Sequence, residues 1–140
     1  MTVSLAVALL LSLAGQPGDR WVWAFYDSDG DVVLAREVPD TARLSAVLEC
    51  ERGSGVARLT VYGPEARPEF VNVSAGDVSA DTERVESDGL AIRLRLDHPL
   101  FAAFGRGETL TVSAGEERAF APAPASSVLN AFRAACRGAM

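Results

Sequence analysis

The clearest potential for chemistry lies in the three carboxylates of Asp27-Ser28-Asp29-Gly30-Asp31. Alternating acids beside a glycine resemble the start of a calcium loop, but an EF-hand needs Gly at its sixth position and a bidentate Glu at its twelfth. Counted from Asp27, the glycine is fourth and the twelfth residue is Val38. The spacing therefore favours a solvated hairpin turn, and we expect neither a metal site nor a cofactor.

The single histidine, His98, lies between Asp97 and Pro99. Nucleophilic catalysis needs a base that a third group orients, and the sequence offers no recognisable companion for His98. Acid pairs of the glycosidase type can always form by chance among 19 Asp and Glu residues. We expect His98 to cap a helix or to lie on the surface, and we expect the chain not to be an enzyme.

Aromatic side chains gather in the segment Trp21-Val22-Trp23-Ala24-Phe25-Tyr26. Alternation along a strand places Trp21, Trp23 and Phe25 on one face. Aromatic strands usually contribute to a core, but they also line grooves that bind peptide or sugar. The candidate partner-binding residues are Trp21, Trp23, Tyr26, Asp27 and Asp29.

Cys50 and Cys136 are the only cysteines. In the segment 44–50 the apolar residues alternate, which places Cys50 on the apolar face of a strand. In the segment 128–136 the apolar residues follow helical spacing, which places Cys136 on the apolar face of a helix. An oxidising compartment would pair two such thiols, and the alternative is two unpaired buried cysteines.

The N-terminus predicts export. Residues 1–15 carry no charged side chain, and the apolar run from Val3 to Ala14 suits a secretory signal peptide, whereas a membrane-spanning helix needs about 20 residues. We therefore expect a signal peptide over 1–15, a single β-rich domain over 16–140, a periplasmic or secreted location, and no stable membrane insertion after cleavage.

Composition limits the other function classes. A chain of 140 residues with 49% hydrophobic residues suits one folded domain and excludes a disordered one. The net charge of −6 would repel a polyanion, so we expect no nucleic-acid partner.

Short alternating segments separated by turns indicate a mainly β fold. The strongest pattern is Leu90–Leu96, with its leucines and isoleucine on one face. Residues 77–88 are acidic and poor in apolar side chains, so we expect a loop or a sheet edge there. A helical turn is expected over 99–104, and a C-terminal helix capped by Ser126 or Ser127. The prediction is an antiparallel β-sandwich or barrel of about seven strands with the helix packed against it.

Two cysteine segments carry a family resemblance, namely the strand Leu44–Cys50 and the closing segment Ala125–Cys136. With the aromatic strand before them and the Leu-rich turn Pro99–Phe101 between them, this order of elements resembles the small periplasmic β-proteins related to VasI/TagO, the type VI secretion accessory proteins. It is similar, more loosely, to invasion-associated locus B proteins. The resemblance implies an envelope domain with a Cys50–Cys136 bridge that acts through contacts, without catalytic residues.

Two functions follow from this reading. The first is a non-catalytic protein-interaction module, which binds a protein of the cell envelope through a sheet edge or an aromatic groove. The second is an inhibitor-like small domain, similar to periplasmic lysozyme inhibitors. Such an inhibitor presents a rigid loop with a charged anchor, and the turns Asp27–Asp31 and Arg52–Gly55 are candidates.

Overall fold

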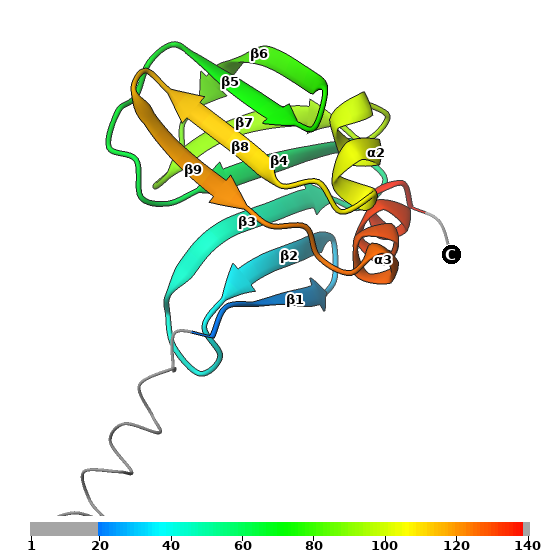
Figure 1. The fold of residues 1–140 in the computed structure, drawn as a ribbon. Helices are drawn as coiled ribbons and strands as arrows, with labels where there is room; N and C mark the ends of the chain where they lie inside the picture. The colour runs from blue at the N-terminus through cyan, green and yellow to red at the C-terminus, as the bar shows by residue number, and fades with distance from the viewer. Residues whose placement is uncertain (1–19, 139–140) are drawn as a thin grey trace, which may run out of the picture.

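The computed structural model describes residues 20–138, so the predicted signal peptide at 1–15 lies outside the described residues. Within them, nine antiparallel strands form one sheet in the order β1-β2-β3-β4-β7-β6-β5-β8-β9, accompanied by two helices (Figure 1). The strands are β1 (Val22–Asp27), β2 (Asp31–Glu37), β3 (Leu44–Glu51), β4 (Val56–Val61), β5 (Phe70–Ala75), β6 (Val78–Val85), β7 (Leu90–Arg95), β8 (Leu110–Ala114) and β9 (Glu117–Ala121). The helices are α2 (Pro99–Gly105) and α3 (Ser126–Cys136).

The mainly β prediction is confirmed, but the structure does not confirm about seven strands or a sandwich or barrel. The described strands form a single open sheet. Figure 1 shows this sheet bent over, with β8 and β9 lying across β3, β4 and β7. One part of the sheet consists of β1, β2, β3, β4 and β7, and the other of β5, β6, β8 and β9. The two parts are joined where β6 pairs with β7 over only two residue pairs, Arg84↔Ile92 and Val85↔Ala91. Both parts bury their apolar faces in one continuous core.

Strand β6 corrects the expectation of a loop or edge over 77–88. It pairs with β5 on one side and β7 on the other, so it is an interior strand. Val78, Ala80 and Thr82 are half-buried, while the alternating Ser79, Asp81 and Glu83 are exposed. Since Val78 is the one strongly apolar residue among these positions, the alternation is present but carries little hydrophobic signal.

The two helices lie at the same end of the bent sheet (Figure 1). Helix α2 begins after His98, whose Nδ1 accepts a hydrogen bond from the Leu100 N–H at 3.1 Å, as expected of a capping histidine. Helix α3 begins after Ala125 and has no side-chain cap, so the expectation of capping by Ser126 or Ser127 is wrong. None of the helices among residues 20–138 is long and apolar enough to cross a membrane.

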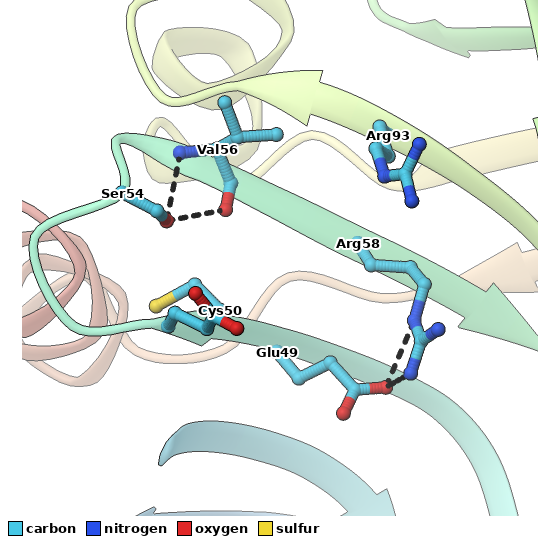
Figure 2. A pocket seen from close by; sticks show the side chains of 7 residues that line it. Glu49, Cys50, Ser54, Val56, Arg58 and Arg93 are labelled. Carbon is cyan, nitrogen blue, oxygen red and sulfur yellow. Dashed lines mark hydrogen bonds and ion pairs between the residues drawn. The ribbon is translucent and has the colours of Figure 1, made fainter. Parts of the chain in front are cut away.

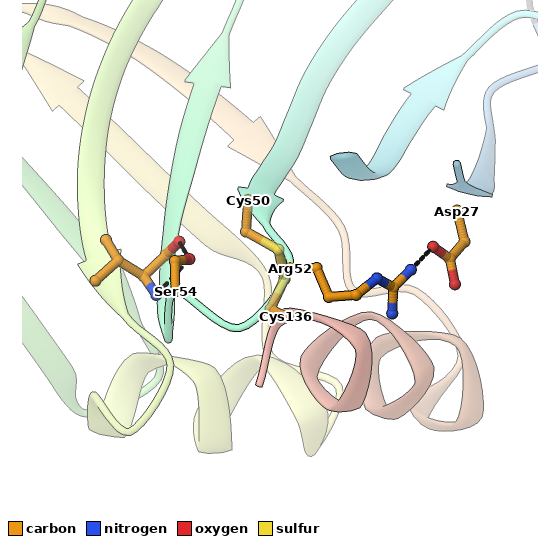
Figure 3. The surroundings of a disulfide bond; sticks show 6 residues. Asp27, Cys50, Arg52, Ser54 and Cys136 are labelled. Atoms are coloured by element: carbon orange, nitrogen blue, oxygen red, sulfur yellow. Dashed lines mark hydrogen bonds and ion pairs between the residues drawn. A yellow bond between two sulfur atoms is a disulfide. The ribbon is translucent and has the colours of Figure 1, made fainter. Parts of the chain in front are cut away.

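The predicted disulfide is confirmed. Cys50 at the end of β3 and Cys136 at the end of α3 are bonded, with their Cα atoms 5.9 Å apart (Figure 3). The carbonyl of Cys136 also accepts hydrogen bonds from the N–H groups of Gly53 at 2.8 Å and Gly55 at 3.3 Å. The last turn of α3 is therefore fixed to the β3–β4 turn by one covalent and two hydrogen bonds.

Candidate functional site

Within the described residues 20–138, strand β1 lies at one edge of the sheet and pairs only with β2. The Ser28 N–H donates to the Asp31 carbonyl at 3.1 Å, which makes Ser28 and Asp31 a hydrogen-bonded pair at the hairpin end. Such pairs alternate with non-hydrogen-bonded ones along an antiparallel ladder. It follows that the backbone groups of Trp23, Phe25 and Asp27 point away from β2, toward the open edge.

The side chains of β1 leave apolar surface exposed beside this edge. Val22 is 40% exposed, Phe25 37% and Tyr26 49%. Within β1 only the last residue, Asp27, is charged, and the strand contains no proline, although charges, prolines and bulges are the features that usually protect an edge strand from pairing.

The opposite edge, β9, is protected in the usual way. It carries Glu117 and Arg118 within its five residues, and Pro122 follows directly. Its exposed Phe120, at 59%, is the one large apolar side chain on that strand. The two edges of the same sheet thus differ in how strongly they discourage a further strand.

Both predicted tryptophans are held by other parts of the molecule. Trp23 packs against the core, with its ring centroid 6.1 Å from that of Phe104 in a T-shaped contact, and its Nε1–H donates to the Pro122 carbonyl at 2.9 Å. The guanidinium carbons of Arg36 and Arg43 lie 5.5 and 5.2 Å from the Trp21 ring centroid. These contacts hold both indole rings against other parts of the protein, so neither ring is free to bind a partner.

The remaining predicted residues lie toward the hairpin end of β1. The Tyr26 hydroxyl donates to the Glu37 carboxylate, with oxygen–oxygen distances of 2.9 and 2.8 Å, and this bond raises the pKa of Tyr26 above its usual value. Asp27 forms an ion pair with Arg52, and Asp29 is exposed in the turn. Tyr26 and Asp27 are successive strand residues, so their side chains point to opposite faces of the sheet, and the structure does not gather Tyr26, Asp27 and Asp29 into one cluster.

The two turns considered as inhibitor anchors prove to be neighbours. Besides the Arg52–Asp27 ion pair, the Arg52 N–H donates to the Gly30 carbonyl at 3.0 Å. Figure 3 shows the Arg52–Asp27 ion pair beside the Cys50–Cys136 bridge. No sequence signal predicted that the turns meet, because the contact depends on the pairing of β2 with β3.

A hollow of about 320 Å³ lies over the outer face of β3, β4 and β7 (Figure 2). Arg58 donates to Glu49 Oε1 through Nε at 3.2 Å and Nη2 at 2.7 Å, and Arg93 lies beside this pair. The residues that line the hollow are Glu49, Cys50, Glu51, Ser54, Val56, Arg58 and Arg93. Sequence reasoning did not find this site, because its residues come from three strands and the turn between two of them.

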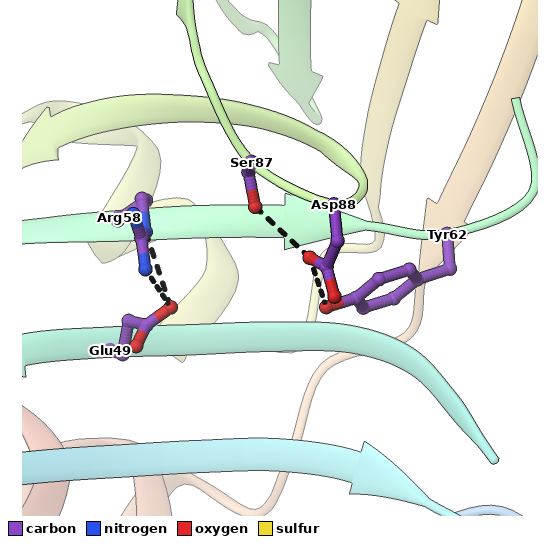
Figure 4. A network of polar contacts seen from close by, with 5 residues as sticks. All are labelled: Glu49, Arg58, Tyr62, Ser87 and Asp88. Carbon is purple, nitrogen blue, oxygen red and sulfur yellow. Dashed lines mark hydrogen bonds and ion pairs between the residues drawn. The ribbon is translucent and has the colours of Figure 1, made fainter. Parts of the chain in front are cut away.

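A second polar network fixes the β6–β7 turn to the end of β4 (Figure 4). The Tyr62 hydroxyl donates to Asp88 Oδ1 at 3.1 Å, and the Ser87 hydroxyl donates to the same oxygen at 3.1 Å. Burial, followed by the hydrogen bond to Asp88, raises the pKa of Tyr62 to about 12. The phenol therefore stays protonated at neutral pH and can donate its hydrogen bond to Asp88 there.

Among residues 20–138, no three His, Cys, Asp or Glu side chains come together in a way that could hold a metal ion. Asp27 and Asp29 belong to the same hairpin turn, but Asp27 is engaged by Arg52. No protein-family model, curated protein or solved structure matches this chain.

Proposed function

We propose that the chain is a non-catalytic exported protein of the periplasm or extracellular space, whose β1 edge accepts an extended segment of a protein partner in the cell envelope. The observation that carries the proposal is the open edge of β1, which carries a charge only at Asp27 and leaves Val22, Phe25 and Tyr26 exposed. An added strand would form main-chain hydrogen bonds with the outward groups of Trp23, Phe25 and Asp27, as in other cases of strand addition.

The rigidity of β1 supports this function. Trp23 is anchored to Pro122 and Phe104, Tyr26 to Glu37, and Asp27 to Arg52. An edge that is already held in its strand conformation loses little conformational entropy when a partner binds, and such preorganisation favours affinity. The Cys50–Cys136 disulfide is compatible with an exported location.

The edge also constrains the partner's chemistry. Side chains next to Val22 and Tyr26 would be apolar or β-branched, because such cross-strand pairs stabilise antiparallel sheets. Near the exposed Asp29 a Lys or Arg of the partner would be favoured by charge, whereas Asp27 is already paired with Arg52. The partner is therefore an extended apolar segment with a basic residue at one end, and nucleic acid is not a partner.

Site-specific photocrosslinking tests the proposal. A photoreactive phenylalanine analogue replaces Tyr26 in one variant and Phe120, on β9, in another. In cells that export the protein, we expect adducts with an envelope protein from position 26 and none from position 120. Adducts from position 120 alone, or from neither position, would contradict the proposal.

A proline scan of the edges provides the matched control. Phe25→Pro removes an N–H that points to the open edge and leaves the β1–β2 hydrogen bonds in place. Phe120→Pro makes the same change on β9. Ala114 and Glu117 flank a two-residue turn and form a hydrogen-bonded pair, and because such pairs alternate with non-hydrogen-bonded ones, the backbone N–H of Phe120 points to the open edge of β9. We expect only Phe25→Pro to abolish the position-26 adduct, with both variants retaining a cooperative melt.

An inhibitor of an envelope hydrolase, of the lysozyme-inhibitor type, is the second candidate. The observation that favours it is the paired turns at Gly30 and Arg52, which are clamped beside the disulfide and present the exposed Asp29. A lysozyme assay with the wild type and with Asp29→Asn distinguishes this candidate. It predicts inhibition that the variant loses, whereas the interaction module predicts no inhibition by either protein.

A further inference from the structure

The hollow on the outer face contains an arrangement of charges that sheet stability does not explain. In the antiparallel register, Glu49 lies opposite Arg58, and Arg58 lies opposite Arg93. Like charges directly opposite each other destabilise a pair of strands. Glu49 neutralises Arg58, whereas the side chain of Arg93 is exposed and forms no ion pair or hydrogen bond with any other described residue.

The opposite side of the hollow has the reverse charge. Glu51, two residues beyond Glu49 on β3, also lines the hollow and lies opposite Asp31 of β2. Here two acids face each other across the sheet. The hollow is thus bordered by unneutralised acid on its β3 side and by an unneutralised guanidinium on its β7 side, in a chain whose net charge is −6.

We propose that this hollow binds a zwitterion of dipeptide size, with the ligand carboxylate at Arg93 and its ammonium group at Glu51. A guanidinium matches a carboxylate through two parallel hydrogen bonds. Arg93 lies level with Glu49 across β4, and Glu51 lies two residues further along β3, so their backbones are roughly 12 Å apart. Both side chains line the hollow between these positions, which matches a short peptide with charged ends.

The ion pair of Glu49 with Arg58 forms the floor between the two ends (Figure 2). Since this pair is already neutral, it adds no net charge for a ligand to balance. The volume of about 320 Å³ lies at the lower end of the range for small-molecule sites. A doubly charged anion such as phosphate would meet the carboxylates of Glu49 and Glu51, so the site discriminates against it.

Four probes test the charge requirements by NMR titration of the ¹⁵N-labelled mature protein. They are alanyl-alanine, its N-acetyl form without the ammonium group, its C-terminal amide without the carboxylate, and inorganic phosphate. We expect saturable shifts of the Glu49, Arg58 and Arg93 amides with alanyl-alanine, and at least tenfold weaker binding of each of the other three probes. The absence of saturable shifts with alanyl-alanine, or equal binding of phosphate, would overturn the proposal.

Variants assign the two ends of the ligand. Arg93→Gln should weaken the binding of alanyl-alanine at least tenfold, whereas Arg118→Gln, at an exposed arginine of β9, should leave it unchanged although the net charge changes equally. Glu51→Gln should weaken alanyl-alanine but not its N-acetyl form. Equal effects of Arg93→Gln and Arg118→Gln would overturn the assigned site, and they would not bear on the β1 edge, which none of these variants alters.

Discussion

Loss of the Cys50–Cys136 bridge should lower the stability of the fold substantially. The cysteines are 86 residues apart in sequence, and the chain-entropy model gives about 4–5 kcal/mol for closing a loop of that length. Near 60 °C, unfolding entropy is about 2.1 cal/mol/K per residue, so for a domain of this size the change corresponds to roughly 15–20 °C in Tm. Helix α3 keeps its packing through Leu129 and Phe132, which are fully buried, so the variant should still fold.

The measurement is thermal unfolding followed by circular dichroism, with Cys50→Ala/Cys136→Ala compared with the oxidised wild type. Alanine is preferable to serine because Cys136 is fully buried, and a buried hydroxyl without a partner adds a cost of its own. Reduction of the wild type under native conditions should give a similar fall in Tm. A fall of less than about 5 °C by both routes would refute the reasoning that the bridge acts mainly on the unfolded chain.

Three further predictions concern single residues. The absorbance titration of Tyr62 should show a pKa of about 12, and Asp88→Asn should lower this pKa only part of the way, because burial is the larger cause of the shift. Since the pKa is raised in the folded state, the contribution of Tyr62 to the free energy of unfolding is present below the pKa of the unfolded chain and is lost as pH rises toward about 12. A pKa at the usual value of tyrosine would contradict the burial of Tyr62. Gly89→Ala should destabilise the fold by about 1–3 kcal/mol in urea unfolding, because its Cβ would lie 2.8 Å from the Val61 carbonyl oxygen, and an unchanged midpoint would refute this. Trp23→Phe should cost about 1 kcal/mol through its lost hydrogen bond, and an equally stable variant would show that this bond does not anchor β1.

Strong alternation and helical spacing made several elements predictable. Leu90–Leu96 reads as a strand with one buried face, and β7 has that form. The two cysteine segments gave a strand and a helix with inward thiols, and the disulfide joins them. Local patterns succeed here because burial acts directly on the residues that form the pattern.

The pairing of distant strands could not be predicted in the same way. β4 pairs with β7 and β5 with β8, although neither pair is adjacent in sequence, and no local signal records such a choice. The hollow around Arg58 and Arg93 exists only in that register. The function of Trp23 as an anchor likewise depends on Pro122, which lies 99 residues further along the chain.

Amide hydrogen exchange at the β1 edge tests the central claim most directly, with the mature protein measured alone and in complex with the envelope protein that crosslinks at position 26. In the free protein, the amides of Trp23, Phe25 and Asp27 should exchange quickly, since they point to the open edge. In the complex, these three amides should become protected while that of Phe120 on β9 stays unchanged. Protection that appears on β9 or elsewhere, and not at these three amides, would contradict strand addition at β1.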